Sequence, residues 1–271
     1  MPEFLQVLPP DAARARWLDA VTHRVNEEYV RAEDALGRVI ARALASPEPL
    51  PAFRRATVDG YAVRAADTFG ATDALPAYLR VVGEVRMGER ASVALRTGEA
   101  VLIHTGGMLP DAADAVVMIE HTQEFTPGEI EVMRPVAPGE NVVQVGEDVM
   151  PGAVILPAGR RVMPQDIGGL LAVGVAGDVP VMCRPRVHIF STGDELVPPE
   201  TGTLGPGQIR DINSGTIGAL CRRAGAEVIH GGIIPDQPGA LLVALETALP
   251  RADLLVVTAG SSVSVRDLTA D

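Results

Sequence analysis

The sequence contains few aromatic residues and no excess of basic charge, and both shortages narrow its possible roles. Only 3% of the 271 residues are aromatic, whereas 47% are hydrophobic, so the cores must be built from Val, Leu, Ile and Ala. The formal net charge of −12 argues against nucleic acid as a partner, because binding a phosphate backbone needs a concentrated basic surface. An anionic ligand would have to be held locally, by backbone N–H groups, a metal ion or a few Arg side chains.

Cysteines and long apolar runs are also scarce. The two cysteines, Cys183 and Cys221, have no Cys or His at metal-ligand spacing, which argues against a thiolate zinc site and favours a reducing compartment. Residues 1–10 lack the basic region and the long apolar run of a signal peptide. No apolar stretch approaches the roughly 18 residues that span a bilayer. We therefore expect a cytoplasmic protein that has no membrane partner.

The first fifty residues have a helical pattern. Asp11 follows a pair of prolines and is predicted to cap a helix, whose apolar positions recur at three- and four-residue steps as far as Val25. Pairs of apolar residues from Ala35 to Leu44 predict a second helix. A short third helix is expected after Pro164.

From Pro51 the pattern changes to short runs that are rich in β-branched residues and separated by Gly, Pro and Asp. Such runs are typical of a β-rich module. The predicted strands include Tyr78–Val85, Val101–Ile103, Val116–Ile119 and Ile130–Met133. This module is expected to extend to about residue 148.

From Arg186 onwards, strands alternate with helices. The strands are apolar without a polar alternation, which is typical of parallel strands that are buried on both faces. The predicted strands are Val187–Phe190, Glu227–Ile229 and Leu254–Val257, and the predicted helices are Ser214–Ala224 and Pro238–Leu249. Gly225 closes the first helix, and Asp236 starts the second. The pattern predicts a doubly wound α/β segment of at least three strands.

These patterns together predict a multidomain α+β protein. Residues 1–50 and 149–182 are expected to form an elongated domain of helices and linkers, into which a β-rich domain of residues 51–148 is inserted. Residues 183–271 are expected to form a partial three-layer α/β domain around a parallel sheet. This domain is partial because three strands and two helices leave one side of the sheet unfinished.

The loops after the three predicted parallel strands carry the first candidate site, because ligands of open α/β sheets bind beyond the carboxyl ends of the strands. Each loop carries an acidic residue, and the third also has hydroxyl groups suited to a phosphate or a pterin edge. The candidates are Thr192, Gly193, Asp194 and Glu195 in the first loop, Asp236 in the second, and Gly260, Ser261, Ser262, Ser264 and Asp267 in the third. Paired carboxylates near a phosphate suggest Mg²⁺.

Each of these loops also has a simpler interpretation. Asp236 fits a plain helix cap equally well. Thr192–Asp194 fits a turn, and Ser261–Ser264 fits a solvated linker. The presence of acidic residues at three consecutive strand ends nevertheless favours a site.

Two segments of the β-rich module carry weaker signals. Asp59 lies in an Asp-Gly turn between apolar neighbours, and His104–Pro110 follows a predicted strand. Asp-Gly is a common turn signal, so neither segment identifies a site by itself. The five histidines do not cluster, and we expect each of them to be structural. They are His23, His104, His121, His188 and His230.

Five segments, in the same order, resemble elements of the molybdopterin molybdenumtransferase family (the MoeA/gephyrin family). Thr57–Val63 is similar to the family's Ser-Ala-Met-Asp-Gly-Tyr-Ala element, and Ile103–Met118 is similar to its Thr-Gly-Ala element. Gly146–Val149 resembles the Gly-Glu-Asp-Ile step that leads out of the β domain. Ser191–Leu196 and Gly232–Asp236 match the first two strand-end loops. No single motif is decisive, but five in register make coincidence improbable.

Such proteins insert molybdate into the dithiolene of adenylylated molybdopterin, with Mg²⁺, and release AMP. The resemblance implies these substrates here, and a molybdopterin-binding role for residues 183–271. The positions that it implies to be functional are Asp59, Thr105, Asp148, Glu195, Asp236 and Asp267, and the metal would be held by Glu195, Asp236 and Asp267. The loop from Gly260 to Ser264 would wrap a pterin or phosphate group.

The resemblance also implies an assembly. In the family, the active cleft lies between the α/β domain of one subunit and the β-rich domain of the other, so a homodimer is implied. A molybdopterin adenylyltransferase is the implied partner in the pathway, because its product is the substrate.

The sequence departs from the family pattern in two places. The third loop of the family reads Gly-Gly-Val-Ser-Val-Gly, whereas Ser264 here replaces the last glycine and restricts a backbone that favours positive φ. The sequence also stops at Asp271, before the Pro-Gly-Lys-Pro segment and the C-terminal β-barrel domain of the family. The α/β segment contains no lysine.

Two other functions stay open at this point. The altered third loop and the missing lysines favour a non-catalytic scaffold or regulator that binds molybdopterin, whereas the acidic residues favour the enzyme. The α/β segment alone is also similar to molybdopterin adenylyltransferases and to relatives that hydrolyse nucleotides. The Asp-Gly-Tyr element of the preceding module argues against this last function, since those relatives do not carry it.

Overall fold

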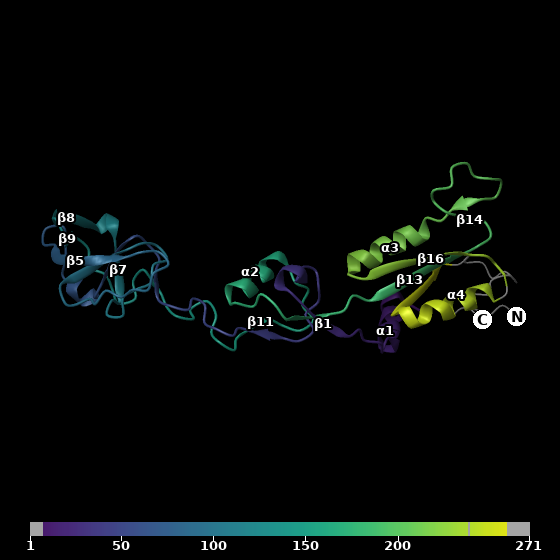
Figure 1. Ribbon diagram of the computed structural model, residues 1–271, viewed down its shortest axis with the longest axis horizontal. Coiled ribbons are helices and arrows are strands. Elements are labelled where there is room, and N and C mark those ends of the chain that lie inside the picture. Colours follow the sequence, from purple (N-terminus) through teal and green to yellow (C-terminus); the bar gives the residue numbers. More distant parts are fainter. Residues whose placement is uncertain (1–7, 238, 259–271) are drawn as a thin grey trace. The chain divides into compact units, whose positions relative to one another are not determined.

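The computed structural model describes residues 8–237 and 239–258 (Figure 1). Contacts between residues divide the chain into two compact units. We call residues 43–157 and 165–176 the β-rich unit, and residues 1–42, 158–164 and 177–271 the α/β unit. The protein is of mixed α+β class and rich in strands, as predicted, whereas the division into three domains stays a prediction.

The β-rich unit is organised around a six-stranded sheet with the order β7-β4-β6-β5-β9-β8. Its strands are β4 (Gly60–Val63), β5 (Ala77–Val85), β6 (Glu99–Ile103), β7 (Ala115–Met118), β8 (Thr122–Thr126) and β9 (Glu129–Val132). The β5–β6 pair is parallel and the other pairs are antiparallel. The four strands that the sequence predicted in this region are confirmed, with bounds that differ by one or two residues.

Both faces of this sheet are buried by aliphatic side chains. Successive residues of a strand point to opposite faces. Ala62 of β4 accordingly packs in one cluster with Val101 and Val116, whereas the next residue, Val63, packs in a second cluster with Val117. The prediction of cores without aromatic residues is confirmed for these two clusters, in which only the half-buried Tyr61 is aromatic.

Shorter elements complete the β-rich unit. Two small antiparallel pairs are formed by β3 (Arg55–Ala56) with β10 (Val142–Val143), and by β2 (Leu44–Ala45) with β11 (Val154–Leu156). The predicted helix after Pro164 is confirmed as α2 (Pro164–Ala172), which buries Leu170.

The helices predicted in the first fifty residues require correction. The first exists as α1 (Pro10–Ala20), but Asp11 lies in its first turn rather than at the cap, and the chain becomes extended at Val21. The second helix is wrong. Gly37 has a φ of 72°, which breaks a helix, and Val39 and Ile40 form isolated antiparallel bridges to Arg161 and Val181 instead. Their β-branched side chains favour that extended backbone.

The same region contributes two further elements to the α/β unit. A short 3-10 helix, η1, spans Ala32–Ala35. β1 (Glu27–Val30) pairs in an antiparallel manner with β12 (Val179–Met182). Among the described residues, no helix has the length and apolar character that crossing a membrane requires.

The predicted parallel sheet is confirmed in the α/β unit. β13 (Arg186–Thr192) lies between β16 (Glu227–Ile234) and β17 (Leu254–Thr258), and both neighbours run parallel to it. Figure 1 shows α3 (Asn213–Ala224) and α4 (Ala240–Ala248) on opposite sides of these strands, and the 3-10 helix η4 (Leu249–Arg251) follows α4. A short parallel pair, β14 (Leu196–Val197) with β15 (Ile209–Arg210), lies in the loop after β13.

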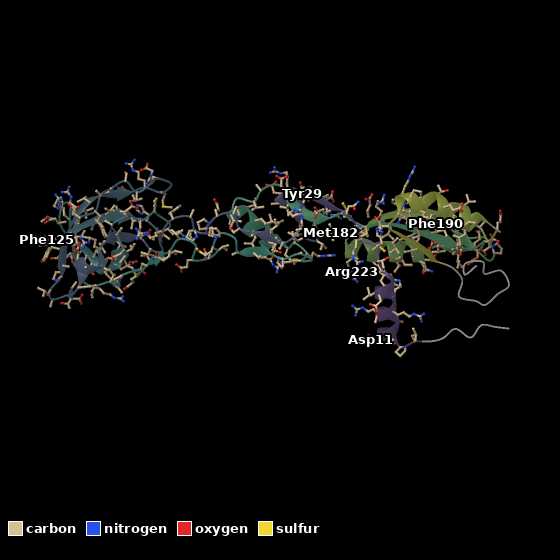
Figure 2. All side chains as sticks on the ribbon, turned by 90° about the horizontal axis from the view of Figure 1, so that it is seen from below. Asp11, Tyr29, Phe125, Met182, Phe190 and Arg223 are labelled. Carbon is tan, nitrogen blue, oxygen red and sulfur yellow. The ribbon has the colours of Figure 1, made fainter. Side chains whose placement is uncertain are left out.

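Two details of this unit follow from single residues. Gly225 closes α3 with a φ of 104°, as the sequence predicted. Phe190, labelled in Figure 2, is buried. A Cβ on Gly231 would lie only 2.1 Å from its ring. The register of β13 and β16 shifts at this point, so the glycine accommodates the aromatic ring.

Candidate functional site

In the β-rich unit, Asp59 and Thr105 form a hydrogen-bonded pair. The backbone N–H of Thr105 donates to Oδ1 of Asp59 at 2.7 Å, and the Thr105 hydroxyl donates to the same oxygen at 3.0 Å. Both residues are exposed. Two residues that the family resemblance singled out separately, 46 positions apart, therefore lie in direct contact.

The register of the sheet explains this pairing. Gly60 at the start of β4 lies opposite Ile103 at the end of β6, so Asp59 lies beside the turn that follows Ile103. A Cβ on Gly60 would lie 1.9 Å from the carbonyl oxygen of Val117, which requires glycine there. Gly107 closes the turn by donating its N–H to the carbonyl of His104 at 2.8 Å.

The electrostatics of the pair favour an ionised Asp59. The backbone N–H of Thr105 is the largest cause that lowers the pKa of Asp59, and the Thr105 hydroxyl lowers it further. His104 also contributes, since its Nδ1 lies 4.0 Å from Oδ1 of Asp59. On its other side, Nε2 of His104 lies 3.1 Å from Oε1 of Glu84 on β5. His104 thus contacts a candidate site residue, although the sequence predicted only a structural role for it.

Asp148 lies elsewhere in the β-rich unit. It is exposed, and its backbone N–H donates to the carbonyl of Leu50 at 2.9 Å. It lines a cleft of about 530 Å³ together with residues of β11 and α2, whereas neither Asp59 nor Thr105 lines that cleft. The structure therefore does not bring Asp148 to the Asp59–Thr105 pair within one unit.

In the α/β unit, the carboxyl ends of β13 and β16 place the predicted acidic residues close together. The backbone N–H of Asp236 donates to Oδ1 of Asp194 at 3.1 Å. Gly193 donates its N–H to the carbonyl of Ile234 at 3.2 Å and has a φ of 142°, which favours glycine. A Cβ on Gly193 would lie 2.6 Å from the carboxylate of Glu195, so that carboxylate folds back over the loop.

The interpretation of Asp236 as a helix cap is wrong. Gly239 is the N-cap of α4, which begins at Ala240, later than predicted. Asp236 is exposed. Its exposed side chain lies just beyond the carboxyl end of β16.

The third loop begins at the end of β17. Oγ1 of Thr192 donates to the carbonyl of Thr258 at 3.4 Å, which ties the first loop to the last described residue of the third strand. The predicted loop residues Gly260, Ser261, Ser262, Ser264 and Asp267 lie outside the described residues.

Sequence reasoning missed one acidic residue near these loops, Asp211. It is only 6% exposed and accepts hydrogen bonds from the hydroxyl of Ser191 at 2.7 Å and from the backbone N–H of Ser214 at 3.1 Å. The Thr258 hydroxyl donates to Ser191 at 3.0 Å, so one polar cluster joins β13, β17 and the start of α3. The available signal was an acidic residue three positions before the predicted start of a helix.

The hydrogen bonds keep Asp211 ionised. Burial raises the pKa of Asp211, but the hydrogen bonds from Ser214 and Ser191 outweigh burial, so the pKa lies below the usual value of 3.8. A buried carboxylate with these partners fixes the positions of the strand ends around it.

Comparison with known proteins gives two family matches. Residues 8–174 match the MoeA N-terminal region (domain I and II), and residues 188–271 match a probable molybdopterin binding domain. Similar proteins include a molybdopterin molybdenumtransferase of Bacillus subtilis, 37% identical over 87% of this chain, and one of Haemophilus influenzae, 33% identical over 97%. This chain covers 55% and 63% of those two proteins.

A solved structure agrees with these matches. The molybdopterin biosynthesis MoeA protein of Pyrococcus horikoshii superposes with a TM-score of 0.87 and is 36% identical in sequence. The superposition covers 93% of this chain and 66% of the other. The matched region thus spans about half to two thirds of the relatives.

Proposed function

Because this chain belongs to the MoeA family, we propose that it supplies the N-terminal region and a molybdopterin-binding segment of a molybdopterin molybdenumtransferase. In this proposal the full-length protein acts in molybdenum cofactor biosynthesis, where it inserts molybdate into adenylylated molybdopterin and AMP is released. The observation that supports it most is the hydrogen-bonded pair of Asp59 and Thr105, because both residues belong to elements that the family resemblance singled out.

The proposed architecture has three domains. Residues 1–50 and 149–182 form an elongated domain, residues 51–148 a β-rich domain, and residues 183–271 a partial three-layer molybdopterin-binding domain. The family match over residues 8–174 supports the first two, since it describes two domains. We expect the protein to act in the cytoplasm and to receive its substrate from a molybdopterin adenylyltransferase.

The proposed active cleft is shared by two subunits of a homodimer. Asp59 and Thr105 of one subunit would face Glu195, Asp194 and Asp236 of its partner. Asp148, Asp267 and the loop from Gly260 to Ser264 complete the proposed site. Asp59 and Thr105 lie on one compact unit and Glu195, Asp194 and Asp236 on the other, so a cleft between two subunits can combine them.

The strand-end loops fit Mg²⁺ in their donor chemistry. Glu195 and Asp236 offer carboxylate oxygens, which this ion prefers. In residues 8–237 and 239–258, no group of three His, Cys, Asp or Glu side chains is placed to hold a metal ion. Mg²⁺ commonly takes only one or two carboxylates and fills its shell with phosphate oxygens and water, so Glu195, Asp236 and Asp267 would hold it together with the substrate. When bound, it would neutralise the phosphoanhydride as the adenylate leaves.

The protein side chains would bind and orient the substrates. The Thr105 hydroxyl would donate to the incoming oxyanion, and the ionised Asp59 would hold the Thr105 backbone in place through its N–H. The polar cluster around Asp211 would fix the strand ends that carry Thr192 and Glu195. The proposed cleft is rich in carboxylates, so an anionic substrate needs cations beside them.

Few basic side chains are expected beside the carboxylates of the proposed cleft to offset their charge. We therefore expect that this 271-residue chain alone has little or no turnover. The α/β segment contains no lysine, and Arg266 is the only basic residue beside the third loop in the sequence. Weak binding that depends on Mg²⁺ is expected to remain, and Glu195→Ala or Asp267→Ala should reduce it. The alternative function is a non-catalytic molybdopterin-binding scaffold or regulator, which the altered third loop favours.

One experiment separates the enzyme from the scaffold. AMP release from adenylylated molybdopterin is measured with molybdate and Mg²⁺, for this chain and for a longer chain with the part of the relatives that it does not cover. We expect release only by the longer chain. Robust release by the 271-residue chain would refute the cation argument, and no release by the longer chain would favour the scaffold.

A further inference from the structure

His104 lies between two carboxylates from different elements. Its Nε2 is 3.1 Å from Oε1 of Glu84 on β5, and its Nδ1 is 4.0 Å from Oδ1 of Asp59, which precedes β4. The side chains of His104, Glu84 and Asp59 are 43%, 44% and 61% exposed, so solvent and ligands reach all three. Thr105 follows His104 directly and supplies two neutral donors to Asp59.

The turn fixes the imidazole in this position. His104 begins a four-residue turn that Gly107 closes, and a Cβ on Gly107 would lie 2.9 Å from the His104 carbonyl. Gly106 donates its N–H to the carbonyl of Ala56 at 2.8 Å, which anchors the turn to β3. The turn thus fixes the backbone of His104, and Glu84 contacts its ring.

Protonation of Nδ1 of His104 changes the electrostatic charge beside the Asp59 carboxylate. When Nε2–H donates to Glu84, a neutral ring has an unprotonated Nδ1 at 4.0 Å from Oδ1 of Asp59, whereas a protonated ring carries a proton and a positive charge there. The three side chains then carry a formal charge of −1 instead of −2. Imidazole is the side chain that makes this change in the neutral pH range.

We propose that His104, oriented by Glu84, is a specificity-determining residue that supplies the cation beside the Asp59–Thr105 pair. An oxyanion that approaches Thr105 meets a carboxylate, which repels it, unless a positive charge lies next to that carboxylate. The protonated ring therefore admits an oxyanion of the substrate, either molybdate or the phosphoanhydride. This inference rests on the proposed function for the identity of the substrate, but not for the coupling of His104 to Asp59.

The expected size of the effect is modest, because the groups are exposed and water screens them. Exposed pairs change binding by roughly two- to fivefold. Oxyanion affinity at the β-rich unit should thus fall by about this factor between pH 6 and pH 8.

The first test follows the Thr105 amide by NMR in the full 271-residue chain. Its N–H donates to Asp59, so its chemical shift reports the charges on Asp59 and on His104. We expect an inflection in the acid range from Asp59, whose pKa is lowered by its hydrogen bonds to Thr105. His104→Gln should keep this inflection but change the rest of the pH profile, because it removes the imidazole beside Asp59. A matched control, His121→Gln, changes a histidine of the same unit that contacts Arg134 and should keep the whole profile of the unmodified chain.

The second test measures the affinity for molybdate and, separately, for inorganic pyrophosphate at both pH values. We expect the pH dependence in the unmodified chain and in His121→Gln, and its loss in His104→Gln. The oxyanion that shows the effect identifies which part of the substrate His104 admits. Glu84→Gln should weaken the pH dependence, because it no longer orients the ring as a charged acceptor.

The outcomes separate this inference from the proposed function. A pH profile of the Thr105 amide that is the same in His104→Gln as in the unmodified chain, or oxyanion affinity that does not depend on pH, would overturn the role of His104. If both results are as expected but the longer chain releases no AMP, the transferase function is wrong and the oxyanion site stands.

Discussion

The two units of this protein position their candidate residues by different physical means. In the β-rich unit, antiparallel register and a glycine in close backbone contact place the exposed pair of Asp59 and Thr105. In the α/β unit, the parallel strands place the loops that follow them at one edge of the sheet. There the buried carboxylate of Asp211 accepts a hydrogen bond from Ser191 of β13, which in turn accepts one from Thr258 of β17. Backbone geometry thus controls the first site, whereas buried polar chemistry controls the second.

The largest expected effect tests whether the backbone geometry at Gly60 holds the strands that position Asp59 and Thr105. Gly60→Ala would place a methyl group 1.9 Å from the carbonyl oxygen of Val117, so β4 and the edge strand β7 must separate. We expect a loss of about 3–5 kcal/mol in the stability of the β-rich unit, measured by denaturant unfolding. Gly168→Ala is the matched control, because α2 has open space there and helices favour alanine. Equal stability of both variants would show that register does not depend on Gly60.

The next effect tests the buried polar cluster. Asp211→Ala removes an ionised acceptor and leaves the Ser191 hydroxyl and the Ser214 N–H without it, which should cost about 2–3 kcal/mol in the α/β unit. Asp236→Ala, at an exposed acid of the same edge, should change stability by less than about 0.5 kcal/mol. Thermal unfolding of both variants checks this. Similar losses in the two would contradict the role of burial.

A smaller effect concerns acid stability at the other end of the sheet. Arg186 forms a bidentate contact with Asp253, and these hydrogen bonds lower the pKa of Asp253 from 3.8 to about 2. A depressed pKa means that the contribution to stability is present above 3.8 and is lost as the pH falls through about 2. Asp253→Asn should flatten the stability of the α/β unit between pH 4 and pH 2. An unchanged slope in that variant would exclude this pair as the cause.

The smallest expected effect concerns His188 in β13. It is 8% exposed, and its Nε2 has no hydrogen-bond partner among the described residues. Because an unpaired buried polar atom costs free energy, His188→Leu should be neutral or stabilise the unit by up to about 1 kcal/mol. Urea unfolding measures this. A clear destabilisation would indicate that the ring has a partner, for example a buried water.

The sequence predicted those features that depend on local pattern. Four strands of the six-stranded sheet, the three parallel strands and the αL closure at Gly225 are confirmed, because apolar periodicity and glycine placement are local signals. The second helix was wrong, because tertiary pairing of Val39 and Ile40 outweighed a helical spacing. The contact of Asp59 with Thr105 was not predicted, since register between strands is set by the whole sheet. Asp211 was missed because its burial depends on a contact with Ser191 of β13, which is 20 positions away in the sequence.

The central claim is that the cleft is shared between subunits, and complementation tests it most directly. In a longer chain that carries the rest of the family sequence, Asp59→Asn and Glu195→Gln should each abolish AMP release. Mixed dimers of the two variants contain one intact cleft and one that carries both changes. Random pairing should therefore restore about a quarter of the unmodified activity. If mixing restores no activity although mixed dimers form, Asp59 and Glu195 of one chain act in the same cleft and the claim is wrong.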